Sequence, residues 1–155
     1  GIGTYWGNVR GIGENVGLNG KTSGIIPFVR VMDSLTLAIS QGSLRRGSAA
    51  CYLDVSHPEI EEFLEIRKPS GDFNRKALNL HHGVLLTDAF MEAVRDGSDF
   101  NLRSPKDQKV LREIDALSVA AGLSLGWLAF NLLVWLHGES PLAMASRCRG
   151  VAVIG

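Results

Sequence analysis

The segment from Ser40 to Ser48 contains the residue types best suited to nucleotide recognition. The amide of Gln41 offers a hydrogen-bond donor and an acceptor, as the edge of a base requires. The guanidinium of Arg45 can hold a phosphate with two hydrogen bonds or stack on a base. The alternative is a solvent-exposed connection whose charged residues have no function, and most loops of this composition are of that kind. Residue types alone therefore leave both interpretations open.

A second glycine-rich stretch, residues 11–22, is similar to nucleotide-binding loops but matches neither common pattern. A P-loop needs a glycine where Asn15 stands, and its lysine leads directly into a helix, which Lys21 does not. The glycines at positions 11, 13 and 17 have the wrong spacing for a dinucleotide-binding fingerprint. What remains is a flexible loop whose backbone amides and Lys21 lie near phosphate groups.

The sequence predicts neither a metal site nor a catalytic centre. His81 and His82 are adjacent in a predicted strand, so their side chains point to opposite faces and cannot chelate one ion together. No nucleophile elbow is present. Cys51 lies in an apolar strand, which predicts an inert core residue. Four carboxylates are expected to form a solvated helix face, namely Glu59, Glu61, Glu62 and Glu65.

Charge and cysteine content exclude several classes of protein. The 16 basic residues balance 16 acidic residues, so no net field favours nucleic acid or an anionic membrane. Cys51 and Cys148 have no short spacing, which predicts reduced thiols in a cytoplasmic protein rather than a disulfide framework. The chain starts at Gly1 without a charged leader, so we expect it to begin inside a larger protein.

A helix is expected directly before the Ser40–Ser48 loop. It begins at Pro27, because proline is favoured in the first turn of a helix. Its apolar residues recur at intervals of three and four, which predicts one buried face. The residues expected on that face are Phe28, Val31, Met32, Leu35, Ala38 and Ile39.

Strands and helices alternate after this loop. Residues 49–55 and 77–86 are predicted as buried strands. Ser56 and Glu59 form a capping box that is expected to start one helix, and Thr87 is expected to cap another. This alternation predicts an α/β architecture with parallel strands, as a sheet or a barrel. The residues of these two helices expected to face the core are Ile60, Phe63, Leu64, Phe90, Met91 and Val94.

The composition changes after Asp115. Residues 116–136 carry no charge and are long and apolar enough to be a transmembrane candidate. We therefore expect two parts, an α/β domain at residues 1–115 and an apolar tail at residues 116–155. One alternative function is a non-catalytic, membrane-tethered nucleotide-binding module that uses residues 116–136 as its anchor.

Six short segments in a fixed order form the strongest pattern in the chain. They are Gly1-Ile2-Gly3 with Gly7 and Arg10, Thr22 to Phe28, Ser40 to Ala50, His57 to Glu61, Asn74-Arg75, and Ser104 to Asp107. Together they resemble the large, catalytic subunit of class I ribonucleotide reductases, continuously from Gly1 to about Asp115. This resemblance favours nucleotide recognition over a solvated connection for the Ser40–Ser48 loop.

The resemblance implies a fold and an activity. The family's fold is a ten-stranded α/β barrel made of two antiparallel halves of parallel strands, and this chain would supply part of one half. The family reduces ribonucleoside diphosphates to deoxyribonucleotides under allosteric control by dNTP or ATP, with no covalently bound cofactor. It works as a large-subunit dimer with a radical-generating small subunit. A cysteine thiyl radical removes the ribose 3′-hydrogen, and a cysteine pair then supplies two electrons.

The resemblance also implies roles for residues of both loops. Arg10 opens the first specificity loop and would hold the phosphates of the effector, with Lys21 in the same loop. The Ser40–Ser48 segment matches the second specificity loop, in which Ser40 lies toward the effector. Gln41 and Arg45 match the positions that reach the substrate. A mobile loop of this kind can transmit the identity of the effector to the choice of substrate.

The resemblance places one further contact in the chain and leaves the radical chemistry outside it. Gly1 matches a glycine whose missing side chain lets the backbone meet the substrate. The redox cysteines and the asparagine–cysteine–glutamate group of the family would lie beyond the two ends, since Cys51 and Cys148 match neither position. We therefore expect the chain to be inactive alone. The departure after Asp115 favours a shifted reading frame or a truncated gene over a membrane or interaction segment.

Overall fold

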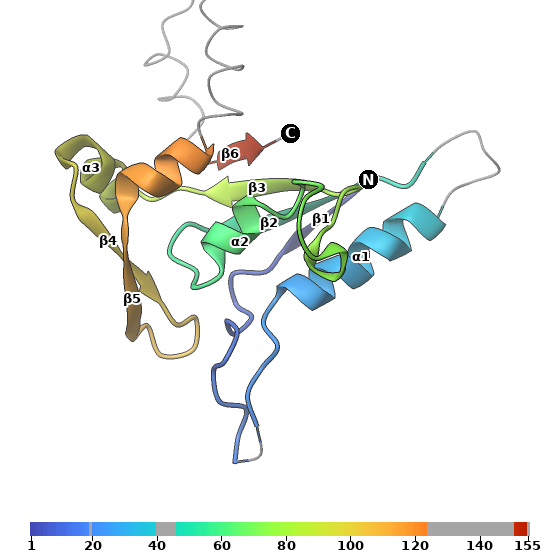
Figure 1. Cartoon of the computed structure of the whole chain (residues 1–155), viewed down its shortest axis with the longest axis horizontal. Helices are drawn as coiled ribbons and strands as arrows, with labels where there is room; N and C mark the ends of the chain where they lie inside the picture. Colours follow the sequence, from blue (N-terminus) through green and yellow to red (C-terminus); the bar gives the residue numbers. More distant parts are fainter. Residues whose placement is uncertain (19, 40–45, 124–150, 155) are drawn as a thin grey trace, which may run out of the picture.

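The structure is a computed structural model that describes residues 1–18, 20–39, 46–123 and 151–154 (Figure 1). Ser40, Gln41 and Arg45, with their predicted contacts to effector and substrate, lie outside the described residues. The same holds for Cys148 and for most of the apolar run at residues 116–136. The roles assigned to these residues therefore stay predictions.

A four-stranded sheet forms the centre of the described part. The strands β1 (Ile2–Tyr5), β2 (Ala49–Asp54) and β3 (His81–Leu85) run parallel in this order. The strand β6 (Val151–Ile154) pairs with β3 in the antiparallel direction. The predicted α/β class with parallel strands is thereby confirmed. Within the described residues the sheet is open, so they form no closed barrel.

The apolar core lies on one face of this sheet. Ala49, Cys51 and Leu53 of β2 point into the core and are buried, while the residues between them are only half-buried. Phe63 of the short helix α2 (Ile60–Leu64) belongs to the same cluster, as the sequence predicts. The Cys51 thiol is free and buried, which confirms its prediction as a core residue.

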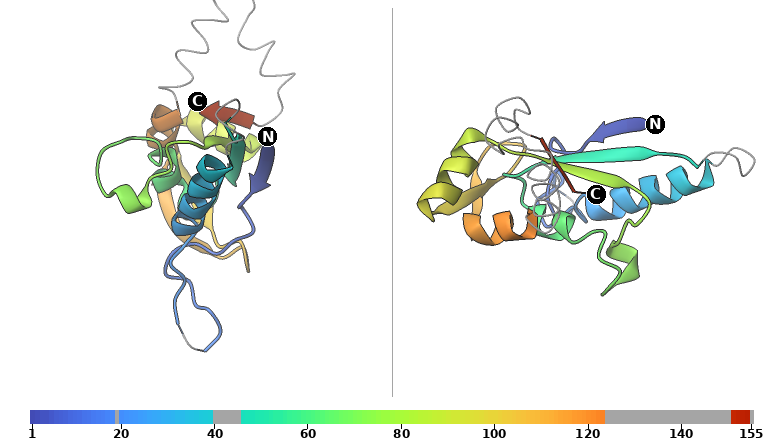
Figure 2. Two further views of the ribbon diagram at one scale, coloured as in Figure 1. Left: turned by 90° about the vertical axis from the view of Figure 1, so that its right-hand side faces the viewer. Right: turned by 90° about the horizontal axis from the view of Figure 1, so that it is seen from above.

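Helix α1 (Ile26–Ala38) packs beside β2, as Figure 1 and Figure 2 show. Its start with Pro27 in the first turn confirms the predicted beginning of the helix. The predicted buried face, however, is wrong except at Met32, which is half-buried against the core. The buried residues of α1 are Ile26, Val29, Asp33 and Thr36. Phe28, Val31 and Leu35 of α1 are exposed, as is Ile39 directly after the helix.

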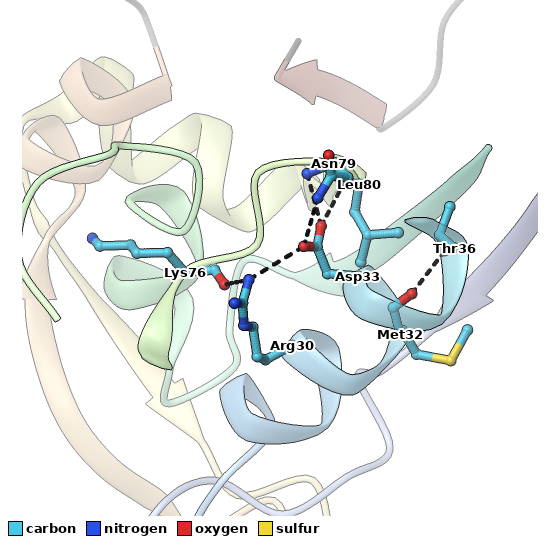
Figure 3. A network of polar contacts seen from close by, with 7 residues as sticks. All are labelled: Arg30, Met32, Asp33, Thr36, Lys76, Asn79 and Leu80. Carbon is cyan, nitrogen blue, oxygen red and sulfur yellow. Dashed lines mark hydrogen bonds and ion pairs between the residues drawn. The ribbon is translucent and has the colours of Figure 1, made fainter. Parts of the chain in front are cut away.

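Asp33 explains why α1 turns this face toward the sheet. Its carboxylate is only 1% exposed and accepts hydrogen bonds from the backbone amides of Asn79 at 2.7 Å and Leu80 at 3.0 Å (Figure 3). The side chain of Arg30 forms an ion pair with it at 3.4 Å. A buried carboxylate is tolerated where hydrogen bonds and an opposite charge replace its water. The bend that presents these two amides also shortens the strand predicted at residues 77–86 to β3.

Helix α3 (Asp88–Asp96) follows β3. Thr87 accepts a hydrogen bond from the amide of Phe90 at 3.3 Å, which confirms the predicted cap. Phe90 is buried as predicted, but Met91 is 52% exposed and its predicted inward position is wrong. Ala93 takes its place in the buried stripe, three residues after Phe90.

The described part also contains an antiparallel hairpin that the sequence analysis does not predict. It consists of β4 (Asp99–Arg103) and β5 (Val110–Asp115). Residues 116–123 are helical and follow it, and the short helix η1 (Phe73–Arg75) lies between α2 and β3. No helix in the described ranges has the length and apolar character needed to cross a membrane.

Candidate nucleotide-binding loops

The chain between β1 and α1 forms a long loop that extends away from the sheet (Figure 1). Its two arms are joined by backbone hydrogen bonds from Gly13 to Thr22 and from Thr22 to Glu14, each 2.9 Å long. Gly13 and Gly17 have φ values of +81° and +58°, a region that glycine enters without strain. The two arms of this loop therefore lie side by side, held by backbone hydrogen bonds.

Two predicted phosphate ligands belong to this loop. Arg10 lies at its base and is half-buried, and Lys21 lies on the returning arm, exposed and bridged to Asn15. Within the ranges that the structure describes, neither side chain forms an ion pair or a hydrogen bond. Their positive charges therefore remain available for an anionic ligand, since no described carboxylate neutralises them.

The base of the loop is closed by Glu59. One oxygen of its carboxylate accepts hydrogen bonds from the backbone amides of Ile25 at 2.8 Å and Ile12 at 3.2 Å. Its side chain is buried, which raises its pKa, while the two backbone hydrogen bonds act in the opposite direction. The prediction of a solvated Glu59 is therefore wrong.

The predicted capping box is wrong for the same reason. Helix α2 has Glu59 itself at its N-terminal cap position and no side-chain capping hydrogen bond. The Glu59 carboxylate is engaged by the loop and cannot reach back to Ser56, so the reciprocal pair of a capping box does not form.

His57 holds the same loop one residue before Arg10, at Val9. Its Nδ1 accepts a hydrogen bond from the amide of Glu59 at 3.1 Å, so the proton lies on Nε2. The Nε2–H group then donates to the carbonyl oxygen of Val9 at 2.9 Å. Burial lowers the pKa of His57, which keeps the ring in this neutral form.

A third side-chain contact joins the loop to the hairpin β4–β5. One oxygen of Glu14 accepts from the amide of Gly11 at 2.8 Å, and the other accepts from the hydroxyl of Ser104 at 2.7 Å. Ser104 is buried next to β4. The structure thus explains why the Ser104 segment belongs to the same pattern as the glycine loop, although the two are far apart in sequence.

The end of the second loop meets the first strand at Gly1. The amide of Ile2 donates to the carbonyl oxygen of Ser48 at 3.1 Å, and a side chain at Gly1 would lie 3.5 Å from the same oxygen. A side chain at Gly47 would overlap the carbonyl oxygen of Thr36 near the end of α1. The structure therefore brings Gly1 and the end of the predicted substrate loop together.

A polar pair at the carboxyl ends of β1 and β2 is absent from the sequence-based prediction. The Tyr5 hydroxyl donates a hydrogen bond to the Asp54 carboxylate, and Gly7 leaves the space for it. Desolvation, with the hydrogen bond and charge of Asp54, raises the pKa of Tyr5 to about 12. The parallel pairing of β1 with β2 is the signal that could have predicted this pair, because it places both carboxyl ends at one edge.

The described residues contain no group of three or more histidine, cysteine or acidic side chains that could hold a metal ion. His81 is exposed and His82 is buried, as the alternation of a strand predicts, so the two do not share a ligand. Among the described residues, the polar groups of the candidate site are those of the first loop and of the 57–59 turn that holds it.

Comparison with known proteins places this arrangement in a family. The chain matches the model of the ribonucleotide reductase barrel domain over residues 1–121. It is 43% identical over 116 residues to a protein of Frog virus 3 (isolate Goorha) named as a ribonucleoside-diphosphate reductase large subunit, covering 75% of the chain and 20% of that protein. The corresponding large subunit of Invertebrate iridescent virus 3 is 51% identical over 87 residues, covering 54% of the chain and 14% of that protein.

A bacterial relative gives the same result. The ribonucleoside-diphosphate reductase subunit alpha of Chlamydia muridarum (strain MoPn / Nigg) is 37% identical over 108 residues, which covers 69% of the chain and 10% of that protein. The chain thus spans a fifth or less of the length of these relatives. Since the family model matches most of its residues, the chain belongs to the ribonucleotide reductase barrel domain family.

Proposed function

We propose that the chain is a segment of a cytoplasmic ribonucleoside-diphosphate reductase large subunit, which reduces ribonucleoside diphosphates to deoxyribonucleotides. The observation that carries this proposal is the match to the barrel-domain model over residues 1–121. The three parallel strands β1, β2 and β3 would form part of one half of a ten-stranded barrel. The open edge of β1 would then pair with a strand supplied by the rest of the subunit.

The loop between β1 and α1 would bind the allosteric effector, a dNTP or ATP. The support for this role is the half-buried Arg10 at the base of the loop, which has no ion-pair partner among the described residues, and the exposed Lys21 on the returning arm. A guanidinium can form two parallel hydrogen bonds to a phosphate, and the ammonium group of lysine adds a second positive charge. Ser40 would face the effector from the following loop.

The substrate would lie on the other side of that second loop. Gln41 and Arg45 would contact the ribonucleoside diphosphate, and the backbone at Gly1 would approach it closely. The contact between Gly1 and Ser48 supports this role, because it brings the end of the second loop to the start of β1. The radical needed for the reaction would come from a partner small subunit, and no residue of this chain is proposed to react.

A second copy of the large subunit would cover α1. Its outward face carries Phe28, Val31, Leu35 and Ile39, all exposed in the single chain. A contiguous apolar helix face of this kind favours contact with a protein surface rather than with water. The dimer contact would therefore lie on the helix that connects the two nucleotide loops.

Calorimetric titration of the full chain with dTTP, dATP and ATP tests the effector site. We expect saturable binding of at least one of the three nucleotides. In Arg10→Ala the affinity should fall by about tenfold or more, because a hydrogen bond to a charged group contributes on the order of 1.5–3 kcal/mol. Arg95→Ala is the matched control, since Arg95 is exposed on α3 and forms an ion pair with the neighbouring Asp96. Equal affinities in the two folded variants would contradict the assignment of Arg10.

A further inference from the structure

The backbone is held on both sides of Arg10 by one short turn. On one side, the Val9 carbonyl accepts a hydrogen bond from His57 at 2.9 Å. On the other side, the Ile12 amide donates to Glu59 at 3.2 Å. The two holding residues are themselves joined, because the backbone amide of Glu59 donates to the His57 ring at 3.1 Å. The position of the Arg10 backbone is therefore set by two side chains that lie 47 or more residues away in sequence.

These contacts are shielded from water. His57 and Glu59 are 2% and 3% exposed, so water cannot readily replace the hydrogen bonds that they make. The direction of the hydrogen bonds is also fixed. The His57 ring donates to Val9 from Nε2 and accepts from the Glu59 amide at Nδ1, and only the neutral tautomer with its proton on Nε2 can make both hydrogen bonds.

Glu59 also closes the loop at its far end. The oxygen that accepts from Ile12 accepts from Ile25 as well, at 2.8 Å, directly before α1 begins. Gly24 has a φ of +82°, and a side chain there would overlap the Glu59 carboxylate. One carboxylate oxygen thus joins the outgoing and returning arms of the loop.

We propose that His57 and Glu59 are positioning residues that hold Arg10 in the orientation required to bind the effector phosphates. This inference rests on the proposed function of Arg10, and neither positioning residue touches the ligand. Arginine loses much side-chain freedom when it binds an anion, and an anchored backbone lowers the further cost of ordering the loop. The affinity for nucleotide is therefore set partly by side chains outside the binding loop.

Three variants of the full chain separate this role from general stability. Glu59→Leu removes the acceptor for Ile12 and Ile25, whereas Glu59→Gln keeps one carbonyl oxygen in the same place. Glu65→Leu is the matched control, because Glu65 is an exposed carboxylate at the end of the same helix. Amide hydrogen exchange reports the Ile12 and Ile25 amides directly, and calorimetric titration with dTTP reports the affinity. Exchange at Leu53 in β2 shows whether the sheet remains folded.

We expect Glu59→Leu to expose the Ile12 and Ile25 amides and to weaken dTTP binding by roughly tenfold, as for the loss of one or two buried hydrogen bonds. Glu59→Gln should restore both properties, and Glu65→Leu should resemble the wild type. Unchanged protection and affinity in a folded Glu59→Leu chain would overturn the proposal. Loss of affinity in Glu59→Leu that Glu59→Gln fails to restore would also overturn it.

Two further outcomes also test the proposal, namely unfolding of Glu59→Leu and a wild-type chain that binds no nucleotide. If the Leu53 amide exchanges rapidly in Glu59→Leu, that variant is unfolded, and His57→Phe is tested in its place. Phenylalanine fills the space of the His57 ring but has no hydrogen-bond donor for Val9. His57→Phe should weaken dTTP binding in the same direction, and wild-type affinity in that variant would overturn the proposal. If the wild-type chain binds no nucleotide, the effector function itself fails, and unprotected loop amides in the wild type would show that the turn does not hold the loop.

Discussion

His82 is a buried histidine in the core beneath the sheet. Neither ring nitrogen has a hydrogen-bond partner among the described residues, and the ring meets Phe63 edge-on with centroids 5.3 Å apart. Burial, with the positive charges of Arg67 and His81, lowers the pKa of His82 from 6.5 to about 4. The folded chain therefore binds a proton at this position less readily than the unfolded chain.

This difference predicts how stability depends on pH. Above pH 6.5 the neutral His82 ring does not lower the free energy of unfolding. Between pH 6.5 and about 4 the unfolded chain takes up a proton at this position and the folded chain does not, so the free energy of unfolding falls as the pH falls. One group contributes a slope of about 1.4 kcal/mol per pH unit. Urea unfolding of His82→Phe should show a flatter acid slope than the wild type. The exposed His81→Phe is the control, and an identical slope in both variants would contradict the prediction.

The pair His81 and His82 also shows what a local pattern can predict. A strand alternates its side chains every two residues, so the sequence alone assigns them to opposite faces. The contacts of Glu59 could not be predicted in this way, because its amide partners are 34 and 47 residues distant. Such contacts depend on the path of a loop, which the residues next to Glu59 do not encode.

At the scale of elements, α1 shows why a correct helix can be assigned the wrong buried face. The helix has two candidate stripes, and its period of 3.6 residues identifies both without telling which one packs inward. Asp33 determines which stripe packs inward, since its carboxylate accepts hydrogen bonds from the Asn79 and Leu80 amides. A hydrophobic pattern cannot predict that a polar residue is buried when its hydrogen-bond donors are backbone amides of a distant segment.

Removing this carboxylate should therefore destabilise the fold strongly. Asp33→Ala leaves the two amides and the side chain of Asn79 without their acceptor, which should cost on the order of 3 kcal/mol. Ser34→Ala, at the next and exposed position of α1, should cost little. Chemical unfolding of both variants measures the difference. A loss below about 1 kcal/mol in Asp33→Ala would show that the network is not what fixes the helix.

At the scale of the whole molecule, the sheet is open within the described residues, and the outward face of α1 exposes apolar side chains. Parallel sheets are usually covered on both faces, whereas one face here carries the exposed Gly1, Gly3 and Tyr5. The sequence predicts the parallel strands β2 and β3, because their signals are local, but it does not predict β1. It does not show which surfaces a second subunit or the rest of a barrel would cover, because such surfaces have the apolar composition of a core.

The proposed dimer contact predicts a specific change in association. Val31→Glu and Leu35→Glu place charges on the exposed apolar face of α1, and burial of an unpaired charge is unfavourable. Sedimentation equilibrium should show self-association of the full chain and association weakened at least about tenfold in both variants. Met91→Glu, at an exposed apolar position on α3, should associate as the wild type does. Equal association in all four chains would exclude α1 as the contact.

The anchor at Asp33 has a mechanical consequence. The 13 residues of α1 make a rod about 20 Å long, and Asp33 lies near its middle. The first loop ends at one tip of this rod, and the Ser40–Ser48 segment follows the other tip in sequence. A tilt of roughly 5° about such a fulcrum moves the two tips by about 1 Å in opposite directions, and hydrogen bonds are sensitive to shifts of that size. Leverage through α1 would thus couple the two loops without any change within the helix itself.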